Sequence, residues 1–175
     1  MRGHFAIKAL SFTQPYGTLV TAREKILETR SKPTSYRGLV AIHAAKNFPQ
    51  WARSLCQEEP FVSSLKKAGI PVLRESFSFD EHEGIAVSRI PLQAIIGIGF
   101  LADCVSTESL LHGRQLSGKE RSFGDFSPDR WAYRFERVVA LPEPIFCKGA
   151  QGFWTPPPDV YTKLENFIVA RAAVA

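Results

Sequence analysis

In the segment AREKILETRS, residues 22–31, the charged side chains of Lys25, Glu28 and Arg30 lie within six residues of one another, next to apolar residues. If this segment is extended, Glu28 and Arg30 point to the same face of a strand, because side chains alternate, and Lys25 reaches that face across a turn. A guanidinium offers a planar pair of donors to a phosphate, an ammonium is a point charge, and a carboxylate accepts hydrogen bonds from a base edge. We therefore expect a cleft for a phosphorylated or hydrogen-bonding ligand.

A simpler interpretation of the same spacing stays open. Glu28 pairs with Lys25 or Arg30 only to neutralise them, and such an exposed ion pair contributes little to stability. Spacing alone does not separate this interpretation from a ligand site.

The elements before and after these charges are short. Pro15 at a first helical turn predicts a helix that ends near Glu24, which leaves Lys25 where the helix stops. A glycine turn at Gly38 leads into a β-branched and apolar run at 39–43, which predicts a buried strand. Both elements serve to position the charged segment.

A helical apolar pattern follows from Pro49 to Ala68 and includes Trp51. Pro60 divides it into two short helices, and Gly69 ends the second, because proline interrupts a helix and glycine is typical of a helix end. After a weakly patterned stretch from 71 to 89, a long central strand begins at Ala94.

Gly97 and Gly99 inside that strand indicate a bulge or bend that curls a sheet toward a barrel. The polar stretch 112–130 predicts a long functional loop, such as a lid. A half-buried strand follows from Trp131, with Tyr133 and Phe135 on the same, core-facing side, and the chain turns back in LPEPIFCKGAQGFW. An amphipathic helix over 157–173 ends the pattern.

The fold class expected from this order is α+β, with about five strands in a mixed, curled sheet and flanking helices, in one domain over residues 1–175. The longest apolar run has nine residues, too few for the roughly 20 of a membrane-spanning helix, and no secretory signal is visible. We expect a cytoplasmic protein with no membrane partner and with its three cysteines reduced.

Five blocks in order, LSFTQPY, KILETR, YRGLVAIHAAK, AIIGIGFLADC and WAYRFERVVALPEPIFCKGAQGFW, resemble the ASCH domain family of the PUA-like superfamily, over residues 10–154. The resemblance implies a small, closed or nearly closed mixed β-barrel with a cleft beside the signature Gly-x-Lys-x-x-Glu-x-Arg. Arg23 stands at the glycine of that signature. A glycine there allows a positive φ or a close ligand approach, so Arg23 leaves the local backbone open and adds a charge to the cleft rim.

The predicted ligand-binding residues combine the charged triad with aromatic and basic neighbours in the same blocks. They are Lys25, Glu28, Arg30, Tyr16, Tyr36, Arg37, His43 and Lys148. Each of the added residues also has a structural interpretation: a solvated surface charge, a plain turn at Lys148, or a satisfied histidine at a barrel end. Trp154 is a further candidate for stacking on bases.

The acidic run Asp80–Glu83 has metal-ligating side chains, but contiguous residues cannot all converge on one ion. A solvated turn explains it equally well. We expect neither a metal nor a cofactor.

The first functional hypothesis is a module that binds single-stranded or modified RNA in a basic cleft, supported by the PUA-like resemblance and a net charge of +5. Two to four cationic contacts to single-stranded RNA predict a log–log salt slope of about −1.5 to −3. A protein-interaction module with a vestigial cleft is a third, less specific hypothesis. The sequence does not determine the oligomeric state, although a monomer is favoured.

The second hypothesis is a hydrolase that acts on RNA or a modified nucleoside, of ribonuclease or amidohydrolase type, with Lys25 and Glu28 as catalytic residues. In the amidohydrolase branch of the superfamily, the residue three after the lysine is a threonine nucleophile. Here that position is Glu28, and Thr29 is expected to point away from the cleft. Glu28 as a general base to water stays open.

Overall fold

The computed structural model describes residues 6–70, 90–113 and 116–173. The weakly patterned stretch from 71 to 89, and with it the acidic run Asp80–Glu83, lies outside the described residues. The elements in chain order are β1 (Ile7–Phe12), α1 (Tyr16–Thr21), β2 (Leu27–Arg30), β3 (Gly38–Ala44), α2 (Gln50–Leu55), α3 (Phe61–Lys67), β4 (Ala94–Ser106), α4 (Thr107–His112), α5 (Gly118–Ser122), β5 (Trp131–Phe146), β6 (Phe153–Trp154) and α6 (Pro158–Ala172).

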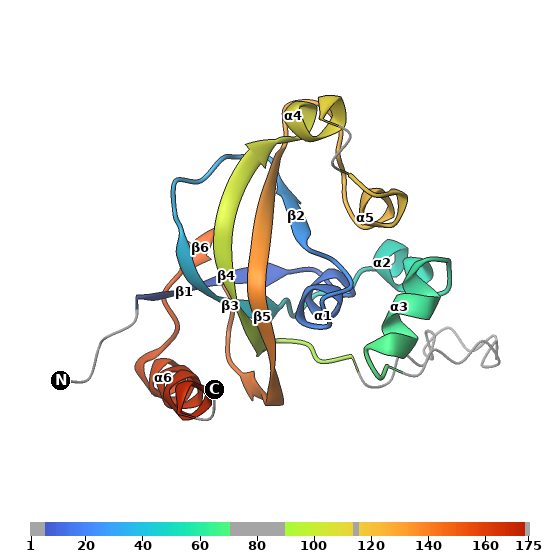
Figure 1. The fold of residues 1–175 in the computed structure, drawn as a ribbon. Coiled ribbons are helices and arrows are strands. Elements are labelled where there is room, and N and C mark those ends of the chain that lie inside the picture. Colours follow the sequence, from blue (N-terminus) through green and yellow to red (C-terminus); the bar gives the residue numbers. More distant parts are fainter. Residues whose placement is uncertain (1–5, 71–89, 114–115, 174–175) are drawn as a thin grey trace, which may run out of the picture.

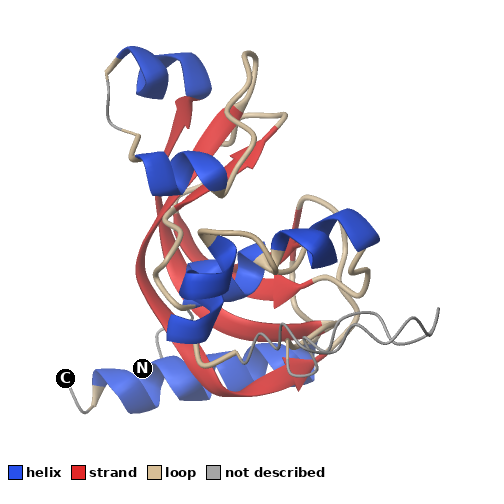
Figure 2. Ribbon diagram, turned by 90° about the vertical axis from the view of Figure 1, so that its right-hand side faces the viewer, coloured by secondary structure: helices blue, strands red, loops and turns tan. Residues whose placement is uncertain are grey.

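The described strands form one sheet in the order β2-β5-β4-β3-β1-β6. The pair β1–β3 is parallel and the other neighbours are antiparallel, so the sheet is mixed. It curls into a half-barrel with helices around it (Figure 2). The α+β prediction is confirmed, but β2 and β6 are edges, so the described sheet is open, with six strands rather than five.

Glycines in β4 account for part of the curl. The register between β4 and β5 shifts between Ile95 and Gly97 and again between Ile98 and Phe100, as expected for bulges. A Cβ at Gly97 would lie 2.5 Å from Thr21 Cγ2 and 2.8 Å from the Val139 carbonyl oxygen. Gly97 therefore allows α1 to pack closely against the sheet, which places the end of α1 next to the charged segment.

The two faces of the sheet are covered by different helices (Figures 1 and 2). On the concave face, Val20 of α1 packs with Phe12, Ile42 and Phe135. On the other face, the terminal helix α6 packs through residues such as Leu164 against alternate residues of β1, β3 and β4. The predicted terminal helix and the core role of Tyr133 and Phe135 are thus confirmed.

The paired helices α2 and α3 agree with the pattern that Pro60 divides, and Gly69 follows α3 with a φ of 75°. They pack with Leu19 of α1 and with Phe123. Trp51 differs from its expected place in this apolar pattern, because its side chain is exposed. Successive side chains on a helix point about 100° apart, and in α2 Ala52 faces the core whereas Trp51 faces outward.

The structure refines two predictions for the second half of the chain. The described part of the polar stretch 112–130 is not one long loop: it contains α5, and Phe123 and Phe126 are buried. The turn predicted within LPEPIFCKGAQGFW comes late in that segment, because β5 continues as a strand to Phe146 and β6 begins at Phe153. Pro142 and Pro144 lie beyond the part of β5 that pairs with β2, in the bulge between the Ala140–Gly97 and Ile145–Ile95 pairs with β4, and bulges are where strand prolines are tolerated.

No helix among the described residues is both long and apolar enough to cross a membrane. The three cysteines are free, with Cys56 buried and the other two half-buried. Burial raises the pKa of the Cys56 thiol to about 12, so this thiol stays protonated at neutral pH.

Candidate functional site

A cleft of about 450 Å³ opens where β2, the ends of β1 and α1, helix α2 and the segment after α5 meet. It combines carboxylates, guanidiniums, hydroxyls and aromatic rings from segments far apart in the sequence. The lining residues are Ser11, Thr13, Tyr16, Glu28, Thr29, Arg30, Ser31, Trp51, Phe123, Gly124, Asp125 and Arg130.

Glu28 and Arg30 lie side by side on the cleft wall. Arg30 Nη2 lies 3.1 Å from Glu28 Oε1, and it also donates a 2.7 Å hydrogen bond to the Ser11 carbonyl oxygen. The guanidinium lies over the Phe12 ring, 5.5 Å from its centre. Arg30 therefore links the edge strand β2 to β1 across the open side of the sheet, and its side chain is still 30% exposed.

Lys25 lies beneath the cleft rather than in it, since its side chain is only 1% exposed. Its ammonium donates to the carbonyl oxygens of Leu27 and Phe123, the second at 2.6 Å, and lies 3.7 Å from Glu28 Oε2. Burial lowers the pKa of Lys25, and the Glu28 carboxylate acts in the opposite direction. Of the three charges expected to converge, two line the cleft and the third supports them from below.

Glu28 thus contacts both cations, as the neutralisation interpretation requires, yet its carboxylate also lines an open cleft. The geometry satisfies both interpretations at once. Its side chain is 12% exposed, so a ligand in the cleft can reach it.

Arg23, at the signature glycine, has a φ of 60°. This is the left-handed conformation that favours glycine, and the chain adopts it here with an arginine. The Arg23 Nε donates a 2.9 Å hydrogen bond to the Val138 carbonyl oxygen, and the side chain lines a second recess, beside β5. The Arg23 guanidinium therefore does not lie at the rim of the cleft, where we expected its charge.

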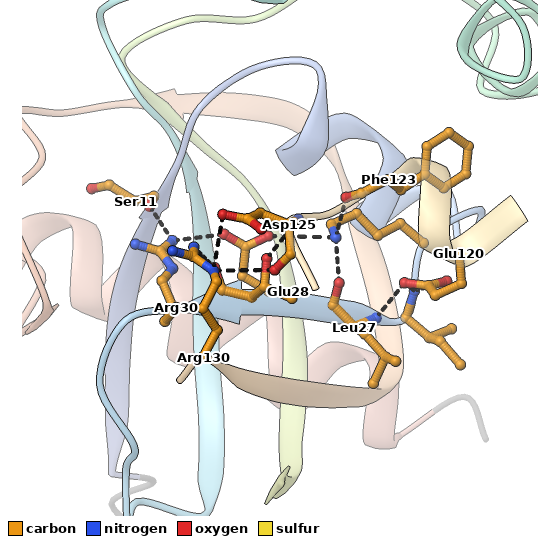
Figure 3. A network of polar contacts seen from close by, with 11 residues as sticks. Ser11, Leu27, Glu28, Arg30, Glu120, Phe123, Asp125 and Arg130 are labelled. Carbon is orange, nitrogen blue, oxygen red and sulfur yellow. Dashed lines mark hydrogen bonds and ion pairs between the residues drawn. The ribbon is translucent and has the colours of Figure 1, made fainter. Parts of the chain in front are cut away.

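The segment around α5 holds the charged residues in place and completes the cleft. The buried Glu120 carboxylate accepts hydrogen bonds from the backbone N–H groups of Ile26 and Leu27, the latter at 2.8 Å. Because Phe123 supplies a carbonyl oxygen to Lys25, the same segment fixes the ammonium. Figure 3 shows Glu120, Phe123 and Leu27 joined in this network.

Beyond α5, Asp125 and Arg130 add a second ion pair to the cleft. Arg130 Nε lies 3.3 Å from Asp125 Oδ2 and donates to the Asp125 carbonyl oxygen, and the Asp125 N–H donates to Thr29 Oγ1. Asp125, Arg130, Glu28 and Arg30 point toward one another (Figure 3). Thr29, expected to face away, is among the lining residues because this segment folds around it.

Tyr16 and Trp51 supply aromatic rings to the cleft. Their ring centres lie 6.5 Å apart with a 37° interplanar angle, and Lys25 Nζ lies 5.5 Å from the centre of the Tyr16 ring. Burial raises the pKa of Tyr16, and the nearby Glu28 carboxylate adds to the effect. Trp51 is 56% exposed, so most of its indole is accessible to a ligand.

The chain is similar to the crystal structure of ASCH from Zymomonas mobilis. The two share 13% identical residues, the TM-score is 0.48, and the alignment covers 90% of this chain and 92% of that chain. No protein-family model and no curated protein matches the sequence.

Five of the predicted ligand-binding residues are not among the cleft-lining residues: the buried Lys25, described above, and four others. The Tyr36 hydroxyl donates to the Leu39 carbonyl oxygen, and its ring packs on Phe153. Arg37 is exposed and pairs with Asp103 at 3.2 Å. Lys148 is exposed in the turn before β6.

His43, the last of the five, is buried at the end of β3. Its ring nitrogens lie 3.1 Å from Ser11 Oγ and 3.1 Å from the Cys147 carbonyl oxygen, and the ring packs edge-on against Trp154. Burial lowers the pKa of His43, and the hydrogen bond with the Cys147 carbonyl oxygen opposes only part of this shift. These contacts are those of a histidine satisfied within the fold.

The sequence reasoning missed Trp51, Asp125 and Arg130. Trp51 was hidden in a helical apolar pattern, and the other two lie in the polar stretch that was singled out only as a whole. Among the described residues, no group of three or more His, Cys, Asp or Glu side chains is arranged to hold a metal ion. The cleft offers hydrogen-bond donors, acceptors and aromatic rings in one place.

Proposed function

We propose that the chain binds single-stranded or modified RNA through this cleft. The observation that carries the proposal is the convergence, in one open recess, of two guanidiniums, two carboxylates and two aromatic rings. Guanidiniums contact phosphates and bases, carboxylates accept from base amino groups, and aromatic rings stack on unpaired bases. The ordered blocks that resemble the ASCH family and the net charge of +5 support the same conclusion.

Within this proposal, the residues have different roles. Glu28, Arg30 and Tyr16 contact the RNA directly, together with Trp51, Asp125 and Arg130. Lys25 is a positioning residue, because its ammonium is buried against Glu28 and two carbonyl oxygens. Tyr36, Arg37 and Lys148 contact RNA only if it extends beyond the cleft, whereas the buried His43 has a structural role.

The test is the affinity of the full chain for a labelled single-stranded RNA, measured by fluorescence anisotropy. Arg130→Gln should weaken binding about tenfold, as expected for losing one or more charge-assisted hydrogen bonds. Arg171→Gln is the matched control, since Arg171 is exposed at the end of α6 and is not among the lining residues. Equal losses in both variants, or no binding by the unmodified chain, would contradict the proposal.

A hydrolase is the second candidate, and one observation favours it. A carboxylate, Glu28, lines the cleft while the neighbouring lysine has a lowered pKa, and such pairs occur in sites for proton transfer. Incubation of the unmodified chain and Glu28→Gln with RNA and with acetylated nucleosides separates the two functions. Release of fragments or acetate by the unmodified chain alone would establish the hydrolase, whereas binding without turnover would exclude it.

A further inference from the structure

The charges that line the cleft are already paired with one another. Arg30 lies 3.1 Å from Glu28, and Arg130 lies 3.3 Å from Asp125. Among the described lining residues these are two cations and two anions, and the buried Lys25 is engaged by Glu28 and two carbonyl oxygens. A phosphate entering the cleft would have to compete with two carboxylates and would meet their negative charge.

A neutral ligand avoids this competition. Each ion pair presents N–H donors and carboxylate acceptors next to each other, so it can bond to an edge that both donates and accepts. Nucleobases have such edges, whereas a phosphate diester only accepts. The paired charges therefore favour the base of a nucleotide over its phosphate.

The aromatic rings point to the same ligand. Trp51 lines the cleft and its side chain is 56% exposed, and the Tyr16 ring lies beside the Trp51 ring. Unpaired bases stack on such rings. A cleft of about 450 Å³ lies toward the small end of ligand sites, which suits one nucleoside rather than a run of nucleotides.

We infer that the cleft receives a single unpaired nucleobase, stacked against Trp51 and read along its edge by the Glu28–Arg30 and Asp125–Arg130 pairs, while the phosphates stay outside. This inference rests on the proposed RNA binding and names the part of the RNA that enters. It assigns to Trp51 a role that the sequence pattern did not indicate. The alternative outcome of the test is that the cleft binds a phosphate of the RNA and not a base.

The experiment titrates the full chain with each of the four common nucleosides, with the matching 5′-monophosphates and with inorganic phosphate, up to millimolar concentrations. Binding is followed by tryptophan fluorescence and by calorimetry. We expect at least one nucleoside to bind with a dissociation constant within about threefold of its monophosphate, and phosphate alone not to compete.

Trp51→Ala should weaken binding of the nucleoside and of single-stranded RNA about tenfold, within the range measured for losing one stacked base, while Trp51→Phe keeps most of the affinity. Phe146→Ala is the matched control. It removes another exposed aromatic ring, 75% accessible at the end of β5 and not among the cleft-lining residues. We expect it to leave both affinities unchanged.

Several outcomes would overturn the inference: a monophosphate bound far more tightly than its nucleoside, competition by phosphate, no nucleoside bound at all, or equal effects of Trp51→Ala and Phe146→Ala. If RNA still binds in any of these cases, the proposed function stands and only the base-in-cleft arrangement fails. Binding of nucleosides without binding of any RNA would support the cleft assignment and refute RNA as the ligand.

Discussion

At the scale of single residues, Lys25 shows how burial changes the role of a charge. Its ammonium lies where two carbonyl oxygens and a carboxylate converge, and only 1% of its side chain is exposed. Such a group stabilises the fold only as long as its partners stay together, because a buried polar atom that loses its partner is costly. Lys25 thereby couples the backbone after α5 to the Glu28 side of the cleft.

Lys25→Met should lower the free energy of unfolding by about 2–4 kcal/mol, because it leaves two carbonyl oxygens and Glu28 without this donor. Lys119→Met is the matched control. Lys119 pairs with Glu24 at the surface, where its side chain is 40% exposed, and we expect a loss below about 1 kcal/mol. Urea unfolding of both variants measures the difference. Similar losses in the two variants would mean that the buried contacts of Lys25 stabilise the fold no more than the surface ion pair of Lys119 does.

At the scale of elements, α5 holds the edge strand β2 in place as one wall of the cleft. The strand β2 has only four residues and pairs with β5 on one side. Glu120 of α5 holds the start of β2 by its backbone N–H groups, and Arg30 holds its end to the Ser11 carbonyl oxygen. A short edge strand thus keeps a defined position without a second strand beside it.

Glu120→Ala should lower the free energy of unfolding by about 1–3 kcal/mol, since it leaves buried backbone donors unsatisfied. Hydrogen exchange at the Ile26 and Leu27 amides should accelerate by more than the global loss of stability explains. Glu120→Gln keeps one acceptor oxygen, so its effects should be smaller. If both variants exchange at the same rate as the unmodified chain, α5 does not hold β2.

At the scale of the whole molecule, the net charge of +5 is not concentrated in the cleft. The lining residues balance in charge, and Arg37 and Lys148 lie on the surface outside it. For the RNA binding that we propose, electrostatic attraction therefore comes from the surrounding surface, while the cleft contributes hydrogen bonds and stacking. The proposal thus assigns affinity and selectivity to different parts of the molecule.

The salt dependence of RNA binding tests this division. For the full chain we expect a log–log slope of about −1.5 to −3, corresponding to two to four phosphate contacts by surface cations. Trp51→Ala should shift the whole line to lower affinity with its slope unchanged, because stacking releases no counterions. A flat line for the unmodified chain, or a slope altered by Trp51→Ala, would contradict the assignment of phosphate contacts to the surface and of stacking to the cleft.

Local sequence rules were sufficient for most of the elements. Pro60 and Gly69 delimit α2 and α3, the glycines of β4 mark its bulges, and the amphipathic pattern predicts α6. Alternation also predicts that Glu28 and Arg30 share a face. These features depend on residues near one another in the chain, whose conformational preferences act locally.

Packing between distant segments decided the rest. Lys25 is buried because Phe123, 98 residues later, covers it, and the cleft gains Asp125 and Arg130 because α5 docks on β2. Trp51 is exposed because α2 packs on the core through the neighbouring Ala52. Periodicity cannot tell a core face from a cleft face, since both alternate in the same way, and only the tertiary contacts determine which side meets solvent.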